Sequence, residues 1–196
     1  MTPERPPADL DDDSLMAAAA GGDAAAFRVL VERWSPRVLA FLVRTLARRA
    51  DAEDLAQETF VRVYRAAPHY AGDGRFAAWL FRIAGNLARG ELRRRRVRGW
   101  FLGTPAVDDD ALLASLPAPQ HFDADGPLHA GETRARLARA LADLPDRQRL
   151  AVVLHHFEGL GVREVASALG TSEHAAESLV ARGMAALRRR LGSRRS

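Results

Sequence analysis

Cysteine and lysine are both absent from this sequence of 196 residues. Without cysteine the chain cannot form a disulfide, a thiolate zinc site or a thiol redox switch, so any redox or metal sensing has to reside on a partner. All 29 basic residues are arginine. Arginine suits bidentate contacts to phosphates and guanine edges, but a G+C-rich genome produces the same bias, and composition does not separate these explanations.

Long apolar runs are also absent. No segment approaches the roughly 20 apolar residues needed to span a bilayer. The short apolar stretch 16–20 follows Asp11, Asp12 and Asp13, which carry the wrong charge for a signal peptide. We therefore expect a cytoplasmic protein without direct membrane insertion.

Charge is arranged in blocks along the chain. Residues 1–74 contain 9 arginines against 12 acidic residues, and residues 75–98 contain 8 against 1. Residues 99–131 contain 5 acidic residues and no arginine, whereas residues 132–196 contain 12 arginines against 7 acidic residues. This pattern indicates two parts with basic surfaces, joined by an acidic connector.

Apolar residues recur at three- and four-residue steps from Asp23 onward, which predicts helices that bury one face. Pro36 interrupts the first run, and the sequence leaves open whether one helix bends there or a second helix begins with Ser35 as its cap. Asp51 can cap the next helix, which ends before Pro68. These helices predict a packed N-terminal core.

A further helix is predicted from about Arg75 and runs into an arginine-rich segment, 93–98. Residues 99–131 include 4 prolines and no periodic apolar face, which is typical of a linker. No strand pattern or internal repeat is visible. We predict an all-α protein with an N-terminal extension and first helix (1–22), a helical domain (23–98), a flexible acidic linker (99–131) and a second helical domain (132–192).

The segment 162–179 predicts a helix-turn-helix. Ala166 stands where two helices touch closely, and Gly170 stands where the turn needs a positive φ. The recognition helix then begins near Ser172 or Glu173 and enters the major groove. A plain helical hairpin is the structural alternative. The residues predicted to face the DNA are Ser172, Glu173, His174, Glu177, Ser178 and Arg182.

The arginine-rich segment is ambiguous, because charge runs usually form solvated surface. Its helix also carries Phe76 and Trp79, and aromatic side chains beside a cationic track can hold unstacked bases, although the same spacing suits a core. Asn86 is the stronger candidate for reading a base, because its amide both donates and accepts hydrogen bonds.

Carboxylates gather on the helix that begins at Asp51. Paired carboxylates can serve acid–base catalysis, but no nucleophile, glycine-rich phosphate loop or metal-ligand cluster accompanies these. We therefore expect no catalytic residue, no metal site and no cofactor, and interpret the acidic helix as a protein-binding face.

These segments together resemble the extracytoplasmic-function (ECF) group of the sigma-70 family. Residues 51–64, DAEDLAQETFVRVY, are similar to the helix by which that family binds core RNA polymerase. Residues 76–96, FAAWLFRIAGNLARGELRRRR, are similar to its promoter-melting and minus-ten element. Residues 141–187, with LPDRQR at 144–149, resemble its C-terminal minus-thirty-five domain.

The resemblance implies an alternative sigma factor with region 2 in 23–98 and region 4 in 132–192, held inactive by an anti-sigma protein. It implies that the acidic linker, with Asp108, Asp109 and Asp110, threads toward the active-site channel of the polymerase. The implied core-polymerase-binding residues are Asp51, Asp54, Gln57, Glu58 and Phe60. Those implied to bind minus-ten DNA are Arg75, Trp79, Asn86, Arg93, Arg94, Arg95 and Arg96, with the loop 70–75 beside Asn86.

The recognition helix departs from the family pattern. Many members carry basic residues where this chain has Glu177 and Leu179, and a threonine–valine pair at Ala175 and Ala176. Loss of two cations weakens phosphate contacts, whereas Glu177 can accept a hydrogen bond from cytosine N4. Two other functions stay open: a sigma-like decoy that sequesters an anti-sigma protein, and a helix-turn-helix transcriptional regulator.

Overall fold

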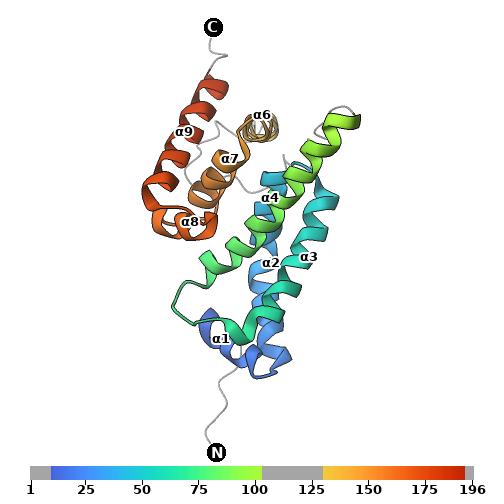
Figure 1. Ribbon diagram of the computed structural model, residues 1–196, viewed down its shortest axis with the longest axis vertical. Helices are drawn as coiled ribbons and strands as arrows, with labels where there is room; N and C mark the ends of the chain where they lie inside the picture. Colours follow the sequence, from blue (N-terminus) through green and yellow to red (C-terminus); the bar gives the residue numbers. More distant parts are fainter. Residues whose placement is uncertain (1–9, 103–129, 193–196) are drawn as a thin grey trace, which may run out of the picture.

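The structure, a computed structural model, describes residues 10–102 and 130–192, and within these ranges every regular element is a helix (Figure 1). The all-α prediction is therefore confirmed. The N-terminal half contains α1 (Asp12–Ala20), α2 (Ala24–Leu46), α3 (Arg49–Ala66), the 3₁₀ helix η2 (Ala67–His69) and α4 (Phe76–Leu102). The C-terminal half contains α6 (Ala130–Ala142), α7 (Asp146–Val152), the π-helical turn η3 (Val153–Phe157), α8 (Val162–Leu169) and α9 (Glu173–Gly192).

Aspartates cap α1 and α2, and the N-terminal helices close on an apolar core. The prediction that Asp51 caps the next helix is wrong: α3 begins two residues earlier, at Arg49, with no side-chain cap, so Asp51 lies in its first turn. The side chain of Asp23 accepts hydrogen bonds from the backbone N–H groups of Ala25 and Ala26, at 2.8 and 3.1 Å, and so starts α2. Inside the bundle, the rings of Phe41 and Phe81 meet edge to face with their centroids 5.2 Å apart. Fully buried side chains from α1, α2 and α4 include Leu15, Met16, Leu30, Phe41, Leu80 and Phe81.

Pro36 lies inside α2, so the first of the two sequence interpretations holds: one continuous helix passes through the proline. The ring is exposed on the helix surface, where it displaces no packed neighbour. The hydroxyl of Ser35 donates to the carbonyl oxygen of Val31 at 2.5 Å. The carbonyl that lacks an N–H donor because of the proline is that of Glu32, four residues before it, so the hydroxyl bond to Val31 does not replace the lost bond.

The predicted helix-turn-helix is confirmed in the C-terminal half. Gly170 ends α8 with a φ of +58°, and the N–H of Thr171 donates back to the carbonyl of Ala166 at 3.0 Å. Recognition helix α9 then begins at Glu173. Further along α9, a Cβ on Gly183 would lie 2.5 Å from Cγ2 of Val152, so glycine lets α9 pack directly against α7.

The two halves pack against each other, with α8 beside α4 and α7 beside α2 (Figure 1). Arg149 of α7 joins them: its Nη1 donates to the carbonyl of Thr45 in α2 at 2.6 Å. Nε of the same side chain donates to the carbonyl of Leu141 at 2.9 Å, near the end of α6. Burial lowers the pKa of Arg149, with Asp146 and Asp143 acting in the opposite direction.

The helix ends differ slightly from the predicted domain limits. α4 continues to Leu102, past residue 98, and α6 begins at Ala130, before residue 132. The rest of the predicted linker, 103–129, with Asp108, Asp109 and Asp110, lies outside the described residues.

Candidate protein and nucleic-acid interfaces

The residues expected to bind core polymerase all lie on α3, but they differ in exposure. Asp54 and Gln57 are exposed. Glu58 is half-buried and forms an ion pair with Arg62 at 2.7 Å. Phe60 is only 8% exposed. Asp51 is bound by Arg95 of α4, so its carboxylate holds two helices of this half together.

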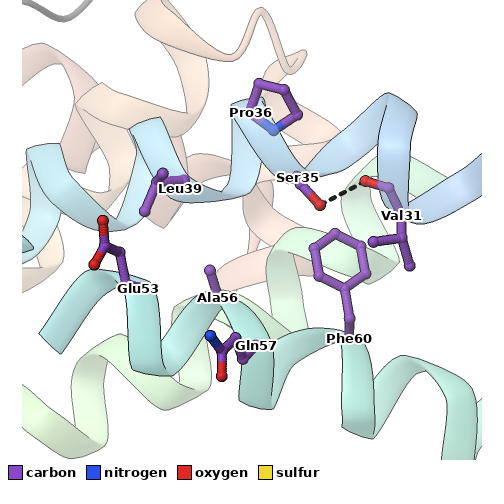
Figure 2. Close-up of a pocket in the computed structure, with 8 residues that line it drawn as sticks. All are labelled: Val31, Ser35, Pro36, Leu39, Glu53, Ala56, Gln57 and Phe60. Atoms are coloured by element: carbon purple, nitrogen blue, oxygen red, sulfur yellow. Dashed lines mark hydrogen bonds between the residues drawn. The ribbon is translucent and has the colours of Figure 1, made fainter. Parts of the chain in front are cut away.

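A groove runs between α2 and α3 and has a volume of about 610 Å³ (Figure 2). Figure 2 shows the ring of Phe60 facing α2 across the groove, with Ala56 beside it. Gln57 and Glu53 place polar groups on the α3 side. The complete lining is Val31, Ser35, Pro36, Leu39, Glu53, Ala56, Gln57 and Phe60. The groove is thus largely apolar, with one carboxylate at its edge.

The four consecutive arginines 93–96 of α4 divide into two sets. Arg93, Arg94 and Arg96 are exposed, although Arg94 pairs with Glu91 at 3.0 Å and Arg96 pairs with Asp146 of α7. Arg95 is turned inward, with its side chain 15% exposed, and pairs with Glu91 at 3.1 Å. Its Nη1 also donates to the carbonyl of Leu46 at 2.7 Å. The exposed set forms a basic surface, whereas Arg95 supports the packing of α2, α3 and α4.

Asn86 is exposed on α4, and its side-chain oxygen accepts a hydrogen bond from Arg89. Nη1 of Arg89 also donates to the carbonyl of Leu169, at the end of α8, at 3.2 Å. Burial lowers the pKa of Arg89, and the nearby cation of Arg147 lowers it further. One arginine therefore connects the candidate base-reading residue to the C-terminal half.

The loop 70–75 precedes α4 and is held at both ends. The hydroxyl of Tyr70 donates to one carboxylate oxygen of Asp13, and the N–H of Gly74 donates to the other at 2.6 Å. The ring of Tyr70 packs against Trp79, with centroids 4.8 Å apart. Trp79 is half-buried, and Arg75 pairs with Asp73 at 3.1 Å.

The recognition helix presents mixed charge. Ser172 caps it, because its hydroxyl accepts a hydrogen bond from the N–H of Ala175 at 3.2 Å. His174, Glu177 and Arg182 are exposed on α9. Glu173 is exposed, and Oε1 of its carboxylate lies 3.9 Å from Nε of Arg163. Ser178 is half-buried. Arg188, Arg189 and Arg190 are exposed near the end of the helix.

A buried carboxylate joins the two halves. Glu158, which follows η3, accepts a hydrogen bond from Arg44 at 3.3 Å and one from Nε of Arg37 at 3.4 Å. Its backbone carbonyl accepts a second bond from Arg37 at 2.7 Å. Burial raises the pKa of Glu158, while Arg44 and Arg37 act in the opposite direction.

No role was predicted from the sequence for Arg37, Arg44, Glu158 or Asp13. One signal pointed to Arg44, which follows the apolar residues 41–43 in a segment of α2 that is buried on all sides. Nothing in the sequence pairs it with Glu158, because the two lie 114 positions apart.

The described part of the chain contains no group of three or more His, Asp or Glu residues placed to hold a metal ion. Among the same residues no helix is long and apolar enough to cross a bilayer.

Two family models match the chain in order. Sigma-70 region 2 matches residues 30–98, and Sigma-70 region 4 matches residues 134–187. The match to region 2 covers α3 and most of α2 and α4, and the match to region 4 covers α7, α8 and most of α6 and α9. The acidic helix and the helix-turn-helix therefore fall in different matched regions.

Among curated proteins, the RNA polymerase sigma factor NccH of Alcaligenes xylosoxydans xylosoxydans is 35% identical, over 90% of this chain and 92% of its own. The ECF RNA polymerase sigma-E factor of Escherichia coli K12 is 32% identical, over 81% of this chain and 82% of its own. Among solved structures, CnrH in complex with the cytosolic domain of CnrY aligns with a TM-score of 0.67 and 29% identity, covering 93% of this chain and 98% of that one. RpoE of Bartonella quintana, in complex with the anti-sigma factor NepR, shares the fold with a TM-score of 0.67, 23% identity and coverage of 86% and 98%.

Proposed function

Because this chain belongs to the ECF group of the sigma-70 family, we propose that it binds core RNA polymerase and directs promoter-specific initiation of transcription. One observation carries this proposal. A single chain holds an acidic face on α3, an exposed arginine track on α4 and a helix-turn-helix in α8 and α9. A helix-turn-helix regulator needs only the last of these.

Core polymerase binds along α3 and the groove beside it. The apolar lining, with Ala56 and Phe60, accepts aliphatic side chains from a partner helix. Asp54 is exposed beside the groove, and Glu53 and Glu58 add carboxylates that pair with Arg49 and Arg62 of the same helix at 2.5 and 2.7 Å. Exchange of these exposed pairs favours a partner with basic residues flanking its apolar ones. Gln57 lies at the junction of the two kinds of surface and hydrogen-bonds the partner backbone.

Minus-ten DNA binds along α4. Arg93, Arg94 and Arg96 contact phosphates, since they are exposed and lie within about one turn of the helix. Asn86 hydrogen-bonds a base that has left the stack, and Trp79 supplies an aromatic surface nearby. Extruding a base costs a few kcal/mol, which stacking and hydrogen bonding at these residues offset.

Minus-thirty-five DNA binds α9 in its major groove. The first turns of α9 place His174, Glu177 and Ser178 toward base edges, and Arg182 follows on the same helix for a phosphate contact. Glu177 favours a cytosine, because its carboxylate can accept from cytosine N4 and repels phosphate.

Promoter binding requires the two halves to separate. The minus-ten and minus-thirty-five elements lie about 25 base pairs apart, which is roughly 85 Å of duplex at about 3.4 Å per base pair. Here Arg89 of α4 donates to the carbonyl of Leu169 in α8 at 3.2 Å. The packed arrangement is therefore a form that precedes promoter binding.

The protein carries out no chemistry of its own and works in the cytoplasm, where core polymerase resides. An anti-sigma protein holds it in the inactive form; the structure of RpoE, which shares the fold, is a complex with the anti-sigma factor NepR, and that of CnrH is a complex with the cytosolic domain of CnrY. Neither cofactor nor metal takes part.

Run-off transcription tests the proposal. Sigma-free core polymerase is combined with this protein and with DNA from upstream of its own gene. Native protein yields defined transcripts, Asn86→Ala lowers their yield by about tenfold, and both proteins bind core with the same affinity. Glu32→Ala, an exposed substitution on α2, is the matched control and leaves the transcripts unchanged.

Binding to core polymerase or to an anti-sigma protein without any transcript, across all promoters tried, would identify the decoy instead. The exposed carboxylate of Glu177, on a helix that otherwise meets phosphates, is the observation that favours that second function.

A further inference from the structure

Asp13 of α1 lies outside every segment assigned to polymerase or DNA so far, yet it contacts the loop that leads into α4. Both oxygens of its carboxylate are used. One accepts the hydroxyl of Tyr70, and the other accepts the N–H of Gly74 at 2.6 Å. These two donors stand at opposite ends of the segment 70–74, so a single carboxylate fixes the distance between the ends.

The loop needs such a restraint because glycine dominates its backbone. Gly72 and Gly74 have φ angles of +62° and +73°, which other residues rarely adopt. Glycine also gives the free loop many other conformations, and a chain of this kind loses much entropy when it is ordered. The contacts to Asp13 select one conformation before any ligand arrives.

The restraint reaches the base-reading surface through aromatic packing. The ring of Tyr70 lies against Trp79, with centroids 4.8 Å apart, and against Phe76, with centroids 5.9 Å apart. Trp79 and Asn86 stand seven residues apart on α4, which places them on the same face of the helix, two turns apart. The loop, Trp79 and Asn86 therefore border one surface.

We propose that Asp13 is a positioning residue for minus-ten recognition, which sets the loop 70–74 and the ring of Tyr70 in the geometry that a base extruded toward Asn86 requires. This inference rests on the function proposed above. Asp13 itself touches no DNA; it acts through Tyr70 and Gly74. Preorganising the loop lowers the entropy lost on binding, so affinity for the correct base increases.

A purely structural role for Asp13, as the attachment of α1, is less consistent with the contacts. Leu15 and Met16 are fully buried and already fix α1 in the core. Asp12, the preceding residue, pairs with Arg33 of α2 at 2.6 Å. α1 therefore has its own attachment to α2, and the contacts of Asp13 go to the loop alone.

The phenol of Tyr70 reports this contact independently of DNA. Burial raises the pKa of Tyr70, and the hydrogen bond and negative charge of Asp13 raise it further. The chain has 2 tyrosines, so in a Tyr64→Phe background Tyr70 alone contributes the phenolate absorbance. Replacing Asp13 by asparagine removes the charge and places an amide donor against one of the two loop donors.

The experiment measures binding of fluorescein-labelled non-template-strand oligonucleotides to the holoenzyme. The oligonucleotides carry the minus-ten segment mapped by run-off transcription, with each of the four bases at the extruded position. Asp13→Asn and Tyr70→Phe are compared with the native protein and with Asp12→Asn, the matched control on the same turn of α1. Alkaline titration of the Tyr64→Phe and Tyr64→Phe, Asp13→Asn proteins gives the pKa of Tyr70 in parallel.

The expected result is that Asp13→Asn and Tyr70→Phe each lower affinity for the preferred base by about five- to tenfold, reduce discrimination among the four bases and leave core binding unchanged. Asp12→Asn retains native affinity, and the pKa of Tyr70 falls when Asp13 is replaced. Two results overturn the inference: an equal loss in Asp12→Asn, or native affinity in Asp13→Asn although the pKa of Tyr70 has fallen. If the native holoenzyme itself binds no promoter oligonucleotide, the proposed function fails and this inference falls with it.

Discussion

Arg44 and Glu158 form an ion pair across the boundary between the two halves of the chain, at 3.3 Å, with side-chain exposures of only 8% and 3%. Arg44 also lies over the ring of Phe157, 4.8 Å from its centroid. Both charges have lost most of their water, so each depends on the other. Separation of the halves returns both to solvent, which makes this pair a determinant of how tightly the halves pack.

Glu158→Gln is expected to separate the halves. The substitution removes the carboxylate charge that Arg44 and Arg37 share, and breaking a buried pair in this way costs about 3–5 kcal/mol. Hydration of Arg44 relieves that cost once the halves part. Small-angle X-ray scattering of the free protein measures the outcome as an increased radius of gyration with unchanged helix content by circular dichroism.

Asp143→Asn is the control for Glu158→Gln. Asp143 pairs with Arg190 at 3.4 Å, but its side chain is 65% exposed, so this pair contributes at most about 1 kcal/mol. Scattering identical to that of the native protein is expected from it. An unchanged radius of gyration in Glu158→Gln would show that the other contacts are enough to hold the two halves together.

Glu177→Arg should strengthen binding of the C-terminal half to duplex DNA. The exposed carboxylate of α9 is replaced by a cation, so affinity rises by about three- to tenfold and the logarithmic salt slope steepens by about one unit. Fluorescence anisotropy at several salt concentrations measures both. Glu32→Arg, with the same change in charge on α2, controls for net charge, and an equal gain there would remove α9 from the explanation.

Filling the groove between α2 and α3 should block polymerase. Ala56→Trp places an indole among the lining residues without replacing any buried side chain, so we expect the affinity for core to fall by about tenfold or more. Ala25→Trp, at an exposed position of α2, should bind core normally. Titration of core polymerase with labelled protein distinguishes the two, and native affinity in Ala56→Trp would exclude the groove as the docking surface.

Two glycines in helices should respond to alanine in opposite ways. A Cβ on Gly183 would meet Cγ2 of Val152 at 2.5 Å, so Gly183→Ala destabilises by about 1–3 kcal/mol. Gly90 in α4 has open space around the same position, so Gly90→Ala stabilises by about 0.4–1 kcal/mol. Urea unfolding followed by circular dichroism gives both values. Adding Val152→Ala to Gly183→Ala should recover part of the loss.

The sequence predicted the features that depend on local pattern. Apolar spacing, Ala166 and Gly170 were together enough for the helix-turn-helix, because a close helix contact, a left-handed turn and a buried inner face occur there at the spacing of that motif; a left-handed glycine alone ends many helices. From Pro36 alone the sequence could not tell one continuous helix from two helices. The structure has one, because the packing of the neighbouring residues decides whether a helix continues through proline.

Contacts between distant segments could not be predicted in the same way. Arg95 belongs to a run of four arginines that looks uniform in sequence, but its packing against Asp51 and Glu91 separates it from its exposed neighbours. Asp13 stands among three consecutive aspartates, and only the fold brings it to Tyr70, which is 57 positions away. The charge pattern of a sequence shows which charged residues are present. Tertiary packing decides which of them form ion pairs or hydrogen bonds within the protein and which stay exposed.

The groove lined by Ala56 and Phe60 also contacts Ser35 and Leu39 of α2, and the helical period places these two on the opposite face of α2 from Arg37 and Arg44, which bind Glu158. Docking at the groove therefore does not require the two halves to part first. Binding to polymerase and separation of the two halves are then consecutive kinetic steps. Binding is second order, so its rate increases with polymerase concentration. Separation is first order, so its rate is independent of polymerase concentration. At high polymerase concentration the observed rate of holoenzyme maturation reaches a plateau, and the height of that plateau is the rate at which the two halves separate, with the contact between Arg44 and Glu158 among those that open.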